Sequence, residues 1–149
     1  MLKHSAFILL LCFVFAPAHA NTDALAYEEQ TLTLDGERQT ARVPKGYHLE
    51  LLSRLDAPRL LTFAANGDLF IGSQSGKVYR LPPPYTQPEV LVQLNQYPHG
   101  VALRRNEILI AQTDGLYRAA YQPGQAKLAA DAVTLLAALP GGGGHNSRT

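Results

Sequence analysis

The residues best suited to chemistry stand at the end of the sequence. Four consecutive glycines, ending at Gly144, are followed directly by His145, and Arg148 comes three residues later. Glycine lets the backbone adopt unusual φ values and approach a ligand closely, so this run predicts a binding loop. Histidine is the usual general base near neutral pH, and arginine offers a fixed fork of donors for an oxygen-rich ligand. The alternative is a flexible glycine linker before an ordinary strand.

Short strands that recur along the chain must position these residues. Three apolar stretches separated by tight polar turns occupy residues 58–81 and again residues 98–121, which is a period of 40 residues. Residues 89–94 and 132–139 predict a fourth strand for each copy. Four-stranded antiparallel units at this period are typical of propeller blades, so we predict an all-β fold of the β-propeller type. A β-sandwich is the alternative, because its turns are also closely spaced.

A hairpin is predicted ahead of the repeats. Residues 30–34 alternate as a strand does, Asp35-Gly36 form a turn, and residues 38–43 supply the return strand. Pro44-Lys45-Gly46 end the hairpin, and residues 47–52 predict a further short strand.

A third copy of the repeat begins near the end of the sequence. Residues 144–149 stand where residues 98–103 stand in the second copy, so His99 is the counterpart of His145. A propeller has at least four blades, and we therefore expect this sequence to be the N-terminal part of a longer propeller. Blade geometry places His99 near the axial face, where ligands collect; the alternative is a histidine that caps a turn or fills the channel mouth. Arg59 occupies the same position in the first copy.

The first twenty residues predict a secretory signal. Lys3-His4 precede an unbroken apolar run over residues 7–15, and Ala18-His19-Ala20 fits the pattern that signal peptidase recognises. Cleavage after Ala20 would leave a mature domain over residues 21–149. The alternative is a membrane anchor, but the apolar run is shorter than the roughly 20 residues that a span needs.

Composition narrows the classes of function. Cys12, the only cysteine, lies in the predicted signal, so a mature protein in the periplasm or outside the cell would lack disulfides. A formal charge of +1 argues against a nucleic-acid surface and a polybasic membrane patch. Spacing typical of a zinc or nicotinamide site is absent, so no metal ligand is predicted. Asp68 and Asp114 are predicted turn residues, and Tyr79, Tyr117 and Tyr121 are predicted packing residues.

Several segments resemble a known family. VPKGYHLELLSRL (residues 43–55) is similar to the first strand of its sorbosone-dehydrogenase-like branch, NGDLFIGSQSGKVYRL (66–81) to the first blade, and YPHGVALRRNEILIAQTDGLYR (97–118) to the second. GGGGHNSRT, which follows Leu-Pro in the same register, completes the pattern. Residues 43–149 thus resemble the glucose/sorbosone dehydrogenase family, exported sugar dehydrogenases that use pyrroloquinoline quinone.

This resemblance implies a fold and a reaction. The fold would be a six-bladed propeller with the quinone over its central channel and calcium bound to the cofactor. His145 would take the hydroxyl proton of an aldose or sorbosone-type sugar while hydride passes to the quinone, and electrons would continue to a periplasmic acceptor. Arg148, Gly144 and His99 are the expected cofactor-binding residues. The calcium ligands and the remaining quinone-binding residues are expected beyond residue 149, so this chain alone is expected to be inactive.

Two other functions stay open from the sequence. One is a propeller without catalysis that binds a protein or glycan, since propellers serve many functions. The other is a metal-dependent lactonase-type propeller, which carboxylates clustered on the axis would favour.

Overall fold

The computed structural model describes residues 25–140, which form two compact units within residues 1–49 and 50–149. The predicted cleavage site after Ala20, and the predicted site residues Gly144, His145 and Arg148, lie outside this range. The described residues are all-β apart from one turn of 3₁₀ helix, Ala130–Ala132. Among them, no helix is long and apolar enough to cross a membrane.

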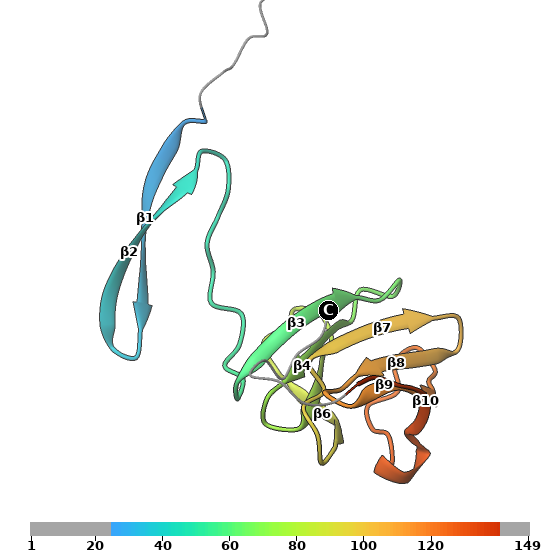
Figure 1. Ribbon diagram of the computed structural model, residues 1–149. Coiled ribbons are helices and arrows are strands. Elements are labelled where there is room, and N and C mark those ends of the chain that lie inside the picture. The colour runs from blue at the N-terminus through green and yellow to red at the C-terminus, as the bar shows by residue number, and fades with distance from the viewer. Residues whose placement is uncertain (1–24, 141–149) are drawn as a thin grey trace, which may run out of the picture. The chain divides into compact units, whose positions relative to one another are not determined.

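The first unit is the predicted hairpin. Strands β1 (Tyr27–Leu34) and β2 (Glu37–Pro44) pair antiparallel from Tyr27↔Pro44 to Leu34↔Glu37 (Figure 1). Asp35 and Gly36, between the strands, have φ of 53° and 83°. Two consecutive positive φ values are what a two-residue hairpin turn requires, which is why an Asp-Gly pair stands there.

The strand predicted over residues 47–52 is wrong. Those residues join no ladder; instead, the side chain of Gln30 holds the start of the segment. Its Nε2 donates to the carbonyl oxygen of Tyr47 at 2.7 Å, and its Oε1 accepts from the backbone N–H of Leu49 at 2.8 Å. One side-chain amide thus takes the place of a neighbouring strand's peptide groups.

The second unit contains two four-stranded antiparallel sheets, which confirm the repeated copies and their fourth strands. The first sheet has the order β3 (Pro58–Phe63), β4 (Leu69–Ser73), β5 (Lys77–Leu81), β6 (Glu89–Gln93). The second sheet has the order β7 (Gly100–Arg104), β8 (Glu107–Ala111), β9 (Gly115–Ala120), β10 (Thr134–Ala138). Neither sheet closes on itself, and each runs as a simple meander (Figure 1).

The middle strands of the two sheets pair in the same way. Ile71 pairs with Tyr79 in the first sheet, and Ile110 pairs with Tyr117 in the second. The two isoleucines are 39 positions apart and the two tyrosines 38, so the second sheet has a turn that is one residue shorter between its middle strands. The period of 40 therefore holds at the starts of the copies and decreases within them.

Each sheet has two faces, which we call A and B. In the first sheet, side chains alternate between face A (Phe70, Gly72, Val78, Arg80) and face B (Leu61, Phe63, Leu69, Ile71, Tyr79, Leu81). In the second sheet, they alternate between face A (Gly100, Ala102, Leu109, Ala111, Leu116, Arg118) and face B (Val101, Leu103, Ile108, Ile110, Tyr117, Ala119). The main core lies where face A of the first sheet packs on face B of the second.

Aromatic and aliphatic side chains fill this core. Phe70, Val78, Ile108 and Ile110 have no exposed surface, and the ring of Phe70 meets that of Tyr121 edge-on with 5.4 Å between centroids. Burying one such side chain contributes roughly 1.5–3 kcal/mol, so the interface between the sheets is a main source of stability.

Gly72 sets how closely the sheets approach. A Cβ atom at this position would lie 2.0 Å from the carbonyl oxygen of Pro98 and 2.7 Å from the carbonyl carbon of His99. The absence of a side chain lets the segment before β7 lie directly against β4. In the same region, the backbone N–H of Leu60 donates to the carbonyl oxygen of His99 at 3.1 Å. We call this contact the joint between the sheets.

Candidate functional site

His99, the one predicted site residue that the structure describes, lies at the joint. Its side chain is 2% exposed, and its Nδ1 is 3.2 Å from the carbonyl oxygen of Tyr97. Its backbone N–H donates to the carbonyl oxygen of Ala111 at 3.0 Å, while its own carbonyl accepts from Leu60. The backbone of His99 is therefore bonded to both sheets, and its side chain is buried. Its contact with a cofactor stays a prediction.

Most of the predicted quinone and calcium site lies outside the described residues. His145, Gly144 and Arg148 lie outside them, so their contacts with His99 stay a prediction. Within residues 25–140, no group of three or more histidine, cysteine or acidic side chains could hold a metal ion. The calcium ligands expected beyond residue 149 stay a prediction.

Sequence reasoning missed a buried ion-pair network on the first sheet. Arg80 Nε donates to Asp68 Oδ2 at 2.7 Å, and Arg80 Nη1 donates to Glu89 Oε2 at 2.6 Å. The Arg80 and Asp68 side chains are 9% and 3% exposed. Asn66 Nδ2 also donates to Asp68 Oδ2, at 2.9 Å. Asp68 is thus both the predicted turn residue and the partner of a buried cation.

The network holds Arg80 in its charged form. Burial lowers the pKa of Arg80, but the hydrogen bonds and charges of Asp68 and Glu89 outweigh this effect and raise the pKa above its usual value. What brings this pair together is the pairing of β4 with β5. Asp68 directly precedes β4, and Arg80 stands on β5 opposite Phe70. No known motif links two residues at that spacing, and the pairing becomes visible once the hairpin register is known.

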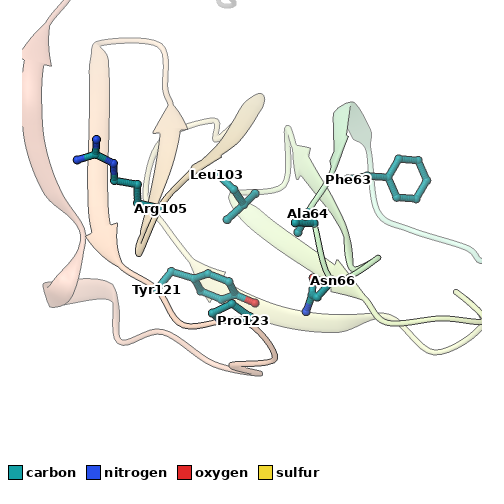
Figure 2. Close-up of a pocket in the computed structure, with 8 residues that line it drawn as sticks. Phe63, Ala64, Asn66, Leu103, Arg105, Tyr121 and Pro123 are labelled. Atoms are coloured by element: carbon teal, nitrogen blue, oxygen red, sulfur yellow. The ribbon is translucent and has the colours of Figure 1, made fainter.

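A pocket of about 320 Å³ lies between the two sheets, beside the β3–β4 and β7–β8 turns. It is at the opposite end of β7 from His99. The residues that line it are Phe63, Ala64, Ala65, Asn66, Leu103, Arg105, Tyr121 and Pro123. Figure 2 shows the side chains of Arg105 and Phe63 extending to opposite sides, with the others between them.

Tyr121 forms part of the wall of this pocket. It is 3% exposed, and within the described residues its hydroxyl has no hydrogen-bond partner. Burial raises the pKa of this phenol, and the nearby charge of Arg80 acts in the opposite direction. The predicted packing role of Tyr121 is therefore confirmed, as it is for Tyr79, which is 6% exposed.

The size and the walls of this pocket suit the binding of a small molecule. Its volume is near the lower end of the 300–1,000 Å³ of ligand pockets, and its walls are largely apolar. Among the described residues that line it, the side chains that can titrate are those of Arg105 and Tyr121. A small apolar or aromatic molecule is the ligand class that such walls suit. His99, the predicted site residue that the structure describes, is not among its lining residues.

In comparisons with known proteins, the chain matches no family model, no curated protein and no solved structure. The resemblance to the sugar dehydrogenases therefore stays a prediction.

Proposed function

We propose that this chain is part of an exported β-propeller dehydrogenase that oxidises an aldose or sorbosone-type sugar with pyrroloquinoline quinone. The observation that carries the proposal is the pair of successive sheets. Both are four-stranded meanders, and face A of one packs on face B of the next, as neighbouring blades of a propeller do. The glycine run before His145 then stands at the start of the next repeat.

The roles of the chain's own residues follow from their chemistry. The bound quinone would supply a two-electron acceptor for hydride. His145, in its neutral form, would take the proton of the sugar hydroxyl. Arg148 would hold oxygen atoms of the cofactor through its fork of donors, and Gly144 would let the backbone come close. His99 would support the site from the joint, through the carbonyl and N–H groups that hold both sheets.

Export and cofactor requirements complete the proposal. The signal at residues 1–20 would direct the protein to the periplasm or out of the cell, where a periplasmic partner would accept the electrons. Calcium would be bound through donors outside residues 25–140. The formal charge of +1 fits a small sugar substrate better than a polyanion.

The pocket beside Tyr121 favours a second candidate, a propeller that binds without catalysis. Its largely apolar walls would suit a small ligand that is held and not transformed. No observation on the described residues favours the metal-dependent lactonase.

Dye-linked oxidation of an aldose by the full-length protein, loaded with the quinone and calcium, tests the proposed reaction. His145→Ala should lower kcat by about 10²–10⁴-fold, the effect typical of losing a general base, while quinone binding changes little. His48→Ala is the control, because His48 is exposed and lies in the other unit. Failure to bind the quinone, or turnover by His145→Ala at the parent rate, would contradict the proposal.

A further inference from the structure

The pocket beside Tyr121 has a single full charge among the described residues that line it, the guanidinium of Arg105. The two other polar side chains are less accessible to a ligand. Asn66 is bonded to Asp68, because its Nδ2 donates to Asp68 Oδ2 at 2.9 Å and its Oδ1 accepts from the Asp68 backbone N–H at 3.2 Å. The hydroxyl oxygen of Tyr121 is buried, so a ligand would meet the ring. Arg105 therefore offers a ligand the strongest polar contact.

The positive charge of Arg105 is not neutralised within the described part of the chain. The acidic residue nearest to it in the sequence, Glu107, pairs instead with Arg118 at 3.5 Å, and Asp68 pairs with Arg80 at 2.7 Å. Arg105 is exposed, and Figure 2 shows its side chain extended at one side of the pocket. Exposed side chains change rotamer within nanoseconds, so this guanidinium can turn toward a bound anion.

The backbone of Arg105 has an unusual conformation. Its φ is 54°, in the left-handed region that side chains other than glycine, asparagine and aspartate rarely adopt. The β3–β4 turn of the first sheet uses Gly67 for its positive φ of 86°. Residues other than glycine that are held in this region cluster at functional sites. The β7–β8 turn thus keeps an arginine where a glycine would be less strained, which points to a use for the side chain.

Backbone hydrogen bonds fix both walls of the pocket. On the first sheet, the N–H of Ala64 donates to the carbonyl oxygen of Asp68 at 2.8 Å; on the second, the N–H of Tyr121 donates to that of Asn106 at 2.9 Å. A ligand would therefore order little of the protein when it binds. In a longer propeller, further sheets would pack on face B of the first sheet and face A of the second, and the pocket between the two sheets would be kept.

We propose that this pocket binds a small aromatic carboxylate. The ligand's ring lies against Leu103, Pro123 and the ring of Tyr121, and its carboxylate accepts two hydrogen bonds from the guanidinium of Arg105. The planar fork of donors on arginine matches the two oxygens of a carboxylate, and such charge-assisted bonds are about twice as strong as neutral ones. Apolar walls beside one cation suit a ligand with an apolar body and one negative charge.

This site goes beyond sugar oxidation, and it rests on the second candidate function, binding without catalysis. Sugar oxidation is proposed to depend on His145 and Arg148, which are not among the lining residues. His145→Ala should therefore bind the carboxylate as the parent does. The failure of one proposal is visible while the other still holds.

Equilibrium dialysis of the full-length protein, loaded with the quinone and calcium, tests the site with three probes. Benzoate has both the ring and the charge, benzamide has the same shape without the charge, and acetate has the charge without the ring. We expect benzoate to bind with a Kd on the order of 1 mM, as befits so small a ligand. Benzamide and acetate should each bind about tenfold more weakly, because each lacks one of the two contacts.

Two matched variants locate the charge that holds the carboxylate. Arg105→Gln should weaken benzoate binding about tenfold and leave the affinity for benzamide unchanged. Arg104→Gln is the control, because it removes an equal charge from the neighbouring exposed residue, which is not among the lining residues. It should bind benzoate within about twofold of the parent, since exposed charges act weakly at a distance. Circular dichroism establishes that both variants keep their β structure.

Each contrary outcome separates the proposals. Equal affinities of the parent for benzoate and benzamide would overturn the carboxylate site and leave the binding candidate in place. Parent-like benzoate binding by Arg105→Gln, or an equal loss in Arg104→Gln, would also overturn it. If the parent binds none of the three probes, both the carboxylate site and the binding candidate fail, while dye-linked oxidation of a sugar by the same protein would still support the dehydrogenase.

Discussion

The two sheets carry the same ion pair in two environments. In the first sheet, Arg80 and Asp68 approach to 2.7 Å, and their side chains are 9% and 3% exposed. In the second sheet, the counterparts Arg118 and Glu107 are 3.5 Å apart and 50% and 36% exposed. The strand register is alike, since Arg80 stands opposite Phe70 and Arg118 opposite Leu109. A repeated sequence therefore sets which charges meet, while the neighbouring sheet decides how much their meeting contributes to stability.

The largest effect expected from this difference comes from removing the two arginines. Arg80→Ala should lower the free energy of unfolding by about 3–5 kcal/mol, because it leaves the Asp68 carboxylate buried without its cation. Arg118→Ala should lower it by less than about 1 kcal/mol, since water solvates Glu107 in either case. Urea denaturation of both variants measures the two changes. Equal losses would show that the burial of the first pair has no energetic consequence.

Exchanging the small residues at the joint sharpens the same comparison. Gly72→Ala should destabilise by roughly 1–3 kcal/mol, the usual effect of overpacking, because the new methyl group would meet the backbone of Pro98. The matched change in the second sheet is Ala111→Gly, because Ala111 pairs with Leu116 as Gly72 pairs with Val78. It should cost only about 0.5–1 kcal/mol, through added freedom of the unfolded chain. Thermal unfolding of the two variants shows which of them loses more stability. A Gly72→Ala protein as stable as its parent would mean that the sheets are not in close contact at this position.

The smallest effects concern two tyrosine hydroxyl groups. Tyr121→Phe should raise stability by about 1 kcal/mol, because it removes a buried hydroxyl that has no hydrogen-bond partner among the described residues. Tyr117→Phe should instead lower stability by about 0.5–1 kcal/mol, since the Tyr117 hydroxyl donates to Asp114 at 3.1 Å. Chemical denaturation near neutral pH compares both variants with the parent.

The stability of Tyr121→Phe should depend on pH differently from that of the parent. Burial raises the pKa of Tyr121 in the folded state above the value near 10 of the unfolded chain. The stability contributed by the neutral phenol is fully present below about pH 10 and is lost as the pH rises through the folded pKa. Tyr121→Phe should therefore lose less stability than the parent above about pH 10. Parallel decreases in the two proteins would contradict the assigned environment.

Much of the fold could be predicted from the sequence, because turn chemistry is local. Asp35-Gly36 and Asn66-Gly67 mark turns whose glycines have φ of 83° and 86°, and the strands on either side formed as expected. Gly115 behaves otherwise: it begins β9, where a Cβ would lie 2.7 Å from the side chain of Leu135. Gly115 is therefore needed for close packing, whereas the pair Asp114-Gly115 in the sequence suggests only a turn. Residues 47–52 are predicted as a strand but form none, because Tyr47 and Leu49 bond to the side chain of Gln30 and not to another strand.

The candidate site was harder to predict than the strands. The position of His99 before β7 follows from the repeat, but its burial depends on Gly72, far away in the sequence. The Arg80 network arises from hairpin register, and the pocket beside Tyr121 arises from two turns that the packing of the sheets brings together. Neither the network nor the pocket can be predicted from residue types at a fixed spacing in the sequence.

The amide of Gln30 has a consequence for local motion in the first unit. Two of the hydrogen bonds to the segment after β2 belong to this one side chain, at Tyr47 and Leu49, and a third joins the backbone N–H of Tyr47 to the carbonyl oxygen of Pro44. Rotation of that side chain about its own bonds breaks both contacts together, while the eight-residue strands of the hairpin stay paired. Loss of the two Gln30 contacts is therefore a local event, and its free energy is expected to be far below that of unfolding the chain.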